Sequence, residues 1–200
     1  MTAAKDLFII AVDPDRSVGQ GDLSLALAGA ELIDLISSAH AVTLDGDLIV
    51  PGRQSAPDDR LLAEAWSALA GQAPYERVED WLWRRGHDLS AAYQAALEEE
   101  GLLHQQRRGR STLGAERVEP VDSPARRQAL SRWADNEPVL AALASAVGIR
   151  SERSEDEPDL DDEAVTTVLV AVNDAVMELE AERQKRAIEN TAFANLWRGP

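Results

Sequence analysis

The sequence predicts a mainly α-helical protein that folds as one compact domain with two small β-hairpins. Apolar residues recur at helical spacing through most of the 200-residue chain, which is the primary signal for helices that bury one face. Aromatic residues make up only 4 % of the chain, so its core must be built from Leu, Ala, Val and Ile, which suit close helix packing. Two segments instead carry the turn residues of hairpins.

The first fifty residues predict one long helix and one hairpin. The apolar run Leu7–Val12 fits a strand and a buried helical turn equally well, because periodicity does not separate the two in so short a run. A broad apolar stripe predicts a mostly buried helix over Leu23–Ser38. Val42–Leu44 and Leu48–Val50 flank Asp45-Gly46, which supplies the positive-φ turn of a hairpin.

The middle of the chain predicts three helices, over residues 55–71, 78–85 and 89–100. Asp58 and Asp59 suit the first turn of the first helix, where the helix dipole favours acids. Asp88 can cap the third helix, and Gly101 can end it.

A second, arginine-rich hairpin is predicted over Leu102–Val118, with two glycines as alternative turn positions. The helix before it ends in Glu98–Glu100, where the helix dipole disfavours acids. We expect Arg107 and Arg108, which follow closely, to supply the compensating cations.

The last third predicts two shorter helices, over residues 123–135 and 138–148, and one long helix that begins near Leu160. Residues 151–159 are polar and acidic, which predicts a mobile loop. The long helix carries a core-facing stripe at helical spacing: Val165, Leu169, Val172, Val176 and Leu179. The pattern weakens after Arg186, so we expect residues 187–200 to form a tail of the single domain, 1–200.

Composition places the protein among ordinary globular chains, with 44 % hydrophobic and 28 % charged residues. The chain has no cysteine, which excludes disulfides and thiolate metal sites. Its start lacks the basic region and apolar run of a secretory signal. The most apolar stretch, Leu23–Val42, contains Glu31 and Asp34, which are costly in hydrocarbon. We therefore expect a soluble, cytoplasmic protein.

Charge is strongly acidic but uneven along the chain. The formal net charge is −16 at pH 7, and such a charge repels nucleic acid and anionic lipid at long range. Residues 104–132 carry seven arginines against three acids, so this segment is +4 and the rest of the chain is −20. This segment is the expected docking place for an anionic partner.

No constellation of residues predicts catalysis, a metal or a cofactor. His40, His87 and His104 have no partner at a metal-ligand spacing, and no Gly-x-Ser-x-Gly turn presents a nucleophile. Gly19-Gln20-Gly21 is too short for a phosphate-binding loop, and the acidic run over 155–163 lacks the ligand alternation of a calcium site. We expect no enzymatic activity.

The aromatic and basic segment Trp81-Leu82-Trp83-Arg84-Arg85 has two interpretations. It can anchor the chain at a membrane interface or on nucleic acid. The favoured interpretation buries one Trp and leaves the other partly covered by arginine side chains.

A DNA-binding regulator of the winged-helix type is the alternative functional class. A helix that ends in Glu-Glu-Gly-Leu-Leu precedes an arginine-rich hairpin, which can contact a phosphate backbone. The preceding helices carry few basic residues, however, and three glutamates end the helix that would face the duplex. We therefore expect no nucleic-acid partner.

Six segments share an order and spacing with a known family: Asp6-Leu-Phe-Ile-Ile-Ala-Val-Asp13, Leu27-Ala-Gly-Ala-Glu-Leu-Ile-Asp-Leu35, Leu44-Asp-Gly-Asp-Leu-Ile-Val50, Pro57-Asp-Asp-Arg-Leu-Leu-Ala-Glu-Ala65, Glu99-Glu-Gly-Leu-Leu103 and Pro138-Val-Leu-Ala-Ala-Leu-Ala-Ser-Ala-Val-Gly-Ile149. Over about residues 6–180 the chain resembles the Golgi phosphoprotein 3 family in its shorter bacterial form. The resemblance implies a compact helical domain whose second hairpin can mediate self-association. It also implies a membrane-peripheral adaptor, because eukaryotic members bind phosphatidylinositol 4-phosphate.

The family's headgroup pocket uses one Trp and three Arg. An alignment anchored without gaps on Gly29 and Gly101 places these four on Gly19, Ala28, His87 and Ser90, so none of the residue types is kept. Arg84 and Arg85 lie just upstream of His87, and the three can form a substitute anion site. Arg126 and Arg127 are the second possibility.

We therefore expect a non-enzymatic binding or adaptor protein that is peripheral at the membrane. The expected partners are an anionic lipid headgroup, bound weakly, and a protein partner or a second copy of the chain. Self-association is expected through the second hairpin, with these residues: Leu102, Leu103, Arg107, Arg108, Leu113 and Val118.

Overall fold

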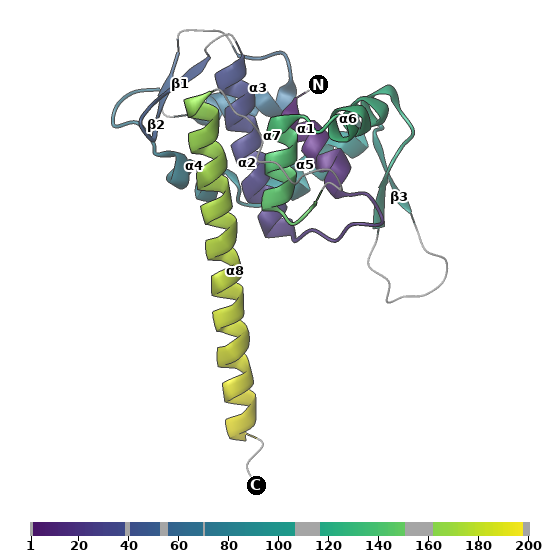
Figure 1. The fold of residues 1–200 in the computed structure, drawn as a ribbon, viewed down its shortest axis with the longest axis vertical. Helices are drawn as coiled ribbons and strands as arrows, with labels where there is room; N and C mark the ends of the chain where they lie inside the picture. Colours follow the sequence, from purple (N-terminus) through teal and green to yellow (C-terminus); the bar gives the residue numbers. More distant parts are fainter. Residues whose placement is uncertain are drawn as a thin grey trace.

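A computed structural model describes residues 2–38, 41–52, 56–69, 71–106, 117–150 and 162–197. Within these residues the fold has eight helices and two separate antiparallel sheets of two strands each (Figure 1). The predicted fold class, mainly helical with two small hairpins, is confirmed. None of the described helices combines the length and the hydrophobicity needed to span a bilayer.

The first apolar run is a helix, which settles the question that periodicity left open. All residues of α1 (Ala3–Ala11) are buried. The side chain of Thr2 accepts a hydrogen bond from the N–H of Lys5 and caps the helix. The N–H groups of Ala3 and Ala4 donate to the carboxylate of Asp34 at 2.9 and 3.2 Å. A complete cap and burial on every side make this short segment helical.

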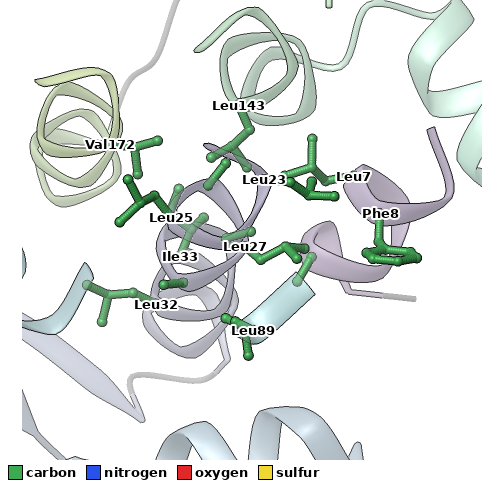
Figure 2. Close-up of a cluster of buried hydrophobic side chains, with 14 of the residues drawn as sticks. Leu7, Phe8, Leu23, Leu25, Leu27, Leu32, Ile33, Leu89, Leu143 and Val172 are labelled. Atoms are coloured by element: carbon green, nitrogen blue, oxygen red, sulfur yellow. The ribbon is translucent and has the colours of Figure 1, made fainter. Parts of the chain in front are cut away.

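The central helix of the fold is α2 (Gln20–Ser37), which begins three residues before the predicted start. Helices α1, α3, α4, α5, α7 and α8 all pack against it. Its buried side chains meet those of its neighbours in one hydrophobic cluster, in which Leu25 lies beside Val172 of α8 (Figure 2). Gly29 allows α8 to cross closely, because a Cβ there would collide with the side chain of Val172.

The first hairpin forms as predicted from β1 (Val42–Asp45) and β2 (Leu48–Pro51). Asp45 pairs with Leu48, and Gly46 in the turn has a φ of +62°. Buried Val42 and Ile49 attach the hairpin to the core.

The next helices follow the predicted order, with two corrections at their starts. Helix α3 (Arg60–Ala68) begins at Arg60, and not at residues 55–57, because Asp59 is its cap and accepts from the N–H of Leu62 at 3.2 Å. Helix α4 (Val78–Arg85) has the predicted bounds.

The cap of α5 (Leu89–Glu99) comes from another helix. Asp88 makes no capping hydrogen bond through its side chain and has a φ of +55°, so the predicted cap was wrong. The hydroxyl of Ser24 on α2 accepts instead from the N–H of Ser90 at 3.0 Å. Gly101, with a φ of +71°, follows the helix as predicted.

Two of the glutamates at the end of α5 pair with described cations that the sequence analysis did not name. Glu100 pairs with Lys5 at 2.9 Å, and Glu99 pairs with Arg60 at 3.0 Å. Arg107 and Arg108, the predicted partners, lie outside the described residues. The prediction missed Lys5 because it is close only after the chain has folded.

The second hairpin consists of β3 (Leu103–Gln106) and β4 (Arg117–Pro120), which pair antiparallel with Leu103 opposite Pro120. Helix α6 (Pro124–Ala134) follows, capped by the Ser123 hydroxyl, and then α7 (Pro138–Ala146). The hairpin and both helices confirm the prediction.

The last helix, α8 (Glu163–Trp197), is longer than predicted. Val165 and Val172 of the predicted stripe are buried, and Leu169, Val176 and Leu179 are partly buried against the core. The helix continues to Trp197 through the segment where a tail was expected, and it projects from the body (Figure 1). The acidic segment 151–159 lies outside the described residues.

Candidate anion-binding sites

Arg85, one of the predicted headgroup ligands, is engaged in a buried ion pair. Its Nε and one terminal nitrogen donate to the two carboxylate oxygens of Glu31 on α2 at 2.8 and 2.9 Å. The hydroxyl of Tyr93 on α5 donates to the same carboxylate at 3.1 Å. The Arg85 side chain is 16 % exposed and that of Glu31 is fully buried. The edge of the guanidinium formed by Nε and Nη2, which is the edge that would bind a phosphate through two hydrogen bonds, is therefore taken by Glu31.

The protonation of this cluster follows from its burial. Burial raises the pKa of Glu31, and the hydrogen bonds and charge of Arg85 lower it again in part. Burial lowers the pKa of Arg85, but the hydrogen bonds and charge of Glu31 outweigh this effect and raise it overall. The buried carboxylate therefore needs the guanidinium, because removing one partner leaves a charge without compensation.

Arg84 is also paired, but at the surface. Its guanidinium donates to both carboxylate oxygens of Glu76 at 2.7 Å and to the carbonyl of Ala68 at 3.2 Å. It lies 5.2 Å from the ring centroid of Trp81. Trp81 itself is buried, and its Nε1 donates to the Ala28 carbonyl, whereas Trp83 is 38 % exposed. One Trp is therefore buried as favoured, with an arginine over the buried ring.

The remaining residue of this group, His87, does not converge with the two arginines. Its side chain is 81 % exposed and lies 3.2 Å from the carboxylate of Asp88. Of the positions aligned with the family pocket, Ala28 is fully buried and Ser90 is buried beside Ser24.

Gly19, the position aligned with the family's Trp, has no room for a side chain. A Cβ there would collide with the carboxylate of Asp22. Asp22 is held in place by Arg183 of α8, which donates to both of its oxygens at 2.7 and 2.8 Å. In this chain an ion pair between α2 and α8 therefore fills the space beside the start of α2.

A cleft of about 270 Å³ lies beside the start of α2, between the loop after α1, α5 and β4. Its lining includes one basic side chain, Arg16, and two acidic ones, Asp13 and Glu119. Ser90, one of the four aligned positions, also lines it. The cleft thus includes one of the four aligned positions, and Arg16 is the single cation in its lining.

Arg16 connects this cleft to a second basic surface on α6. Its guanidinium donates to the Ile10 carbonyl at 3.0 Å and lies 5.2 Å from the ring centroid of Trp133. Trp133 and Arg126 share a face of α6, because seven residues make about two helical turns. Arg127 follows Arg126 in the chain and lies about 100° further around the helix, at the side of this face. We define Arg16, Arg126, Arg127 and Trp133 as the α6 patch.

The arginines of α6 differ in how fully they are neutralised. Arg132 pairs with the buried Asp6 and with Glu137 and therefore belongs to the structure of the fold. Arg127 pairs with Asp122 at 2.8 Å, but both side chains are largely exposed, so this pair is weak. Among the described residues, no acid lies within ion-pair distance of Arg126. Among the predicted arginine ligands, Arg126 and Arg127 are therefore less neutralised than Arg84 and Arg85.

The described residues of the predicted self-association hairpin face their own core in part. Leu103 is buried, and Leu102 and Val118 are partly buried against the core. Arg107, Arg108 and Leu113 lie outside the described residues. In the described part of the chain, no group of three or more His, Asp or Glu side chains can hold a metal ion.

Sequence reasoning did not single out Arg16 or Trp133. They are more than a hundred positions apart, and neither stands in a motif. A weak signal was available, because Arg16 is a lone cation in an acidic loop, Asp13-Pro14-Asp15-Arg16.

One comparison with known proteins identifies the family of the chain. A search of curated proteins gave no match. The family model described as Golgi phosphoprotein 3 (GPP34) matches residues 3–191, which is nearly the whole chain. The chain therefore belongs to the Golgi phosphoprotein 3 family.

Proposed function

We propose that this protein is a non-enzymatic binding module that associates weakly with anionic membrane surfaces through the α6 patch. The single observation that carries the proposal is the contrast between the two pairs of candidate arginines. Arg84 donates two hydrogen bonds to the carboxylate of Glu76, and Arg85 donates two to that of Glu31. Arg126, in contrast, has no acid within ion-pair distance among the described residues. Membership of a family whose eukaryotic members bind a phosphoinositide supports a lipid headgroup as the anion.

The composition of the patch suits a membrane interface. The half-buried ring of Trp133 has an apolar body and a polar N–H, a combination that favours the headgroup region. Arginines bind phosphates through paired N–H groups. Each basic residue near an anionic surface contributes about 1 kcal/mol, so the three cations of the patch supply only a few kcal/mol.

Two features limit the affinity and the selectivity. The chain carries a net charge of −16, which opposes its approach to an anionic surface except where salt screens it, beyond about 8–10 Å. The cleft beside α2 contains Arg16 together with two acids, so it lacks the convergent donors that would select one headgroup. Binding is therefore weak, salt-sensitive and without strong preference for one phosphoinositide, and a protein partner completes the adaptor role.

Co-sedimentation with vesicles tests this function. Vesicles of phosphatidylcholine, of phosphatidylcholine with phosphatidylserine, and of phosphatidylcholine with phosphatidylinositol 4-phosphate are compared at low and physiological salt. We expect binding that rises with anionic charge and falls with salt. Tight, salt-resistant binding to one phosphoinositide would show a complete pocket and contradict the proposal. No binding to strongly anionic vesicles at low salt would also contradict it.

A further inference from the structure

One face of α8 carries an exposed apolar stripe. Among the residues whose burial is described, which leaves out 191–197 at the end of α8, four large apolar side chains are exposed, and three of them lie on α8. Val170, Met177 and Ile188 are exposed by 56, 64 and 70 %. At about 100° per residue, Val170 and Ile188 are five full turns apart, and Met177 and Ala181 lie within about 20° of the same line. We define Val170, Met177, Ala181 and Ile188 as the α8 stripe.

The α8 stripe lies on the side of the helix opposite the body. The inner face of α8 packs into the core with four buried residues: Val165, Val168, Val172 and Ala175. These residues are about half a turn around the helix from the stripe. Side-chain burial against the core therefore accounts for one apolar face of α8. On the other face Val170 lines an open cleft beside Arg77 and Val78 but stays 56 % exposed, and the rest of the stripe lies outside both the core and this cleft.

The far part of α8 has little support from the rest of the fold. Arg183, through Asp22, makes the last ion pair with the body along the described helix. All side chains from Gln184 to Asn190 are exposed, and the helix projects from the body there (Figure 1). Isolated helices shorter than about 12–15 residues are marginal in water. A projecting helix with an apolar stripe is expected to gain stability by packing against another helix.

We infer that the α8 stripe packs against the α8 stripe of a second copy in an antiparallel, two-fold symmetric dimer. A two-fold axis near residue 179 places Val170 opposite the partner's Ile188 and Met177 opposite the partner's Ala181. Each large side chain therefore meets a complementary one, and the same patch serves both copies, as an isologous interface requires. This dimer involves no lipid and does not depend on the proposed function.

The spacing of the stripe suits a long straight contact. Eleven residues separate Val170 from Ala181, and eleven separate Met177 from Ile188. An eleven-residue repeat stays close to the natural periodicity of the helix and does not drift around its surface. At a rise of 1.5 Å per residue, the stripe extends over about 27 Å.

The charges along α8 favour the antiparallel direction. Residues 163–182 contain five acids and no base, whereas residues 183–186 contain Arg183, Lys185 and Arg186. An antiparallel pair places Lys185 beside the partner's Asp174, and the basic segment of one helix beside the acidic half of the other. A parallel pair would place the two acidic halves side by side. Each body lies on the inner side of its own α8, so the two bodies point away from each other.

Molar mass in solution tests the inference, with variants on opposite faces of α8. Sedimentation equilibrium across a wide range of concentration should show a reversible increase above the 21.7 kDa of one chain. Met177→Glu should abolish this increase, because it introduces carboxylates close to the two-fold axis. Asn190→Glu adds the same charge at an exposed position about 160° away from the stripe and should leave the dimer intact. A chain that stays monomeric at every concentration, or a dimer that Met177→Glu does not weaken, would overturn the inference.

Disulfide cross-linking tests the direction of the helices, since the chain has no cysteine of its own. Two variants of distinguishable mass, Val170→Cys and Ile188→Cys, are oxidised separately and as a mixture. The antiparallel dimer should give the mixed cross-link and little of either homodimeric one. Cross-links of each variant with itself, without the mixed product, would show a parallel pair and overturn the arrangement.

Discussion

Arg85 of α4 and Glu31 of α2 form a doubly hydrogen-bonded ion pair, and the Glu31 carboxylate is completely buried. The Tyr93 hydroxyl gives this carboxylate a third donor. The arginine that stands nearest to the family's headgroup position in the sequence thus links three helices of the core. The charge of Arg85 therefore stabilises the core. The candidate arginines that are less neutralised, Arg126 and Arg127, lie on α6.

Removing the guanidinium should destabilise the protein strongly. Arg85→Ala leaves the carboxylate of Glu31 buried without its cation, and we expect a loss of about 3–5 kcal/mol in the free energy of unfolding. Arg84→Ala is the matched control, because its pair with Glu76 is at the surface and contributes at most about 1 kcal/mol. Urea unfolding of both variants measures the difference. Equal losses in the two variants would contradict this role for the Arg85–Glu31 pair.

Lys5 should neutralise Glu100 at the acidic end of α5 and Asp59 beside it. Lys5 pairs with Asp59 and Glu100, both at 2.9 Å, and its side chain is 11 % exposed. We expect Lys5→Ala to lower the free energy of unfolding by about 2 kcal/mol, since charged hydrogen bonds contribute about 1.5–3 kcal/mol each. Arg77→Ala is the control, because its pair with Asp47 is exposed on both sides and contributes little. Equal losses of the two variants in thermal unfolding would refute this role for Lys5.

Asp34 should make stability depend on pH. Burial raises the pKa of Asp34 from 3.8 to about 6, although the N–H groups of Ala3 and Ala4 lower it in part. Because this pKa is higher in the folded chain than in the unfolded chain, folding is favoured by proton binding. The contribution is complete below about pH 4 and is lost as pH rises through about 6, an effect of roughly 3 kcal/mol.

The variant Asp34→Asn isolates this effect from other carboxyls. Burial also raises the pKa values of Asp6 and Glu31, so the wild-type curve contains several groups. The difference in unfolding free energy between wild type and Asp34→Asn should therefore change between pH 4 and pH 6. Two parallel curves of stability against pH would show that Asp34 does not titrate in this range.

Gly29 should be coupled to Val172 where α2 crosses α8. A Cβ at Gly29 would collide with the Val172 side chain, so we expect Gly29→Ala to cost about 1–3 kcal/mol despite the better helix propensity of Ala. Val172→Ala removes the colliding group and should cancel part of this cost in the double variant. A double-mutant cycle by urea unfolding measures the coupling. If the losses in unfolding free energy of the two single variants simply add in the double variant, the strain in Gly29→Ala does not come from contact with Val172.

Local signals predicted most of the helices and both hairpins. The bounds of α4 and the turn at Gly46 follow from neighbouring residues in the chain, because periodicity, turn residues and proline act over a few positions. The cap of α5 was missed because Ser24 supplies it from another helix. Asp88 had the right residue type for a cap, but residue type does not decide which of two available oxygens reaches the N–H of Ser90.

The candidate site was less predictable, because an arginine's availability depends on its distant partners. Arg84 and Arg85 are adjacent in the chain, yet Arg84 pairs with Glu76 at the surface and Arg85 pairs with the buried Glu31. Arg16 and Trp133 meet only through the fold. The long projection of α8 was also missed, since its exposed half lacks the core-facing pattern that predicts a packed helix.

Charge reversal in the α6 patch tests the central claim most directly. The double variant Arg126→Glu with Arg127→Glu is compared with Arg77→Glu with Arg150→Glu, which makes the same change of net charge at exposed positions outside the patch. On phosphatidylcholine–phosphatidylserine vesicles at low salt, the α6 variant should lose at least about tenfold in membrane partitioning, because each cation contributes about 1 kcal/mol. The control variant should show only the small loss of membrane partitioning that the change in net charge causes. Equal losses in both variants would show that only net charge matters, and would contradict membrane attachment through the α6 patch.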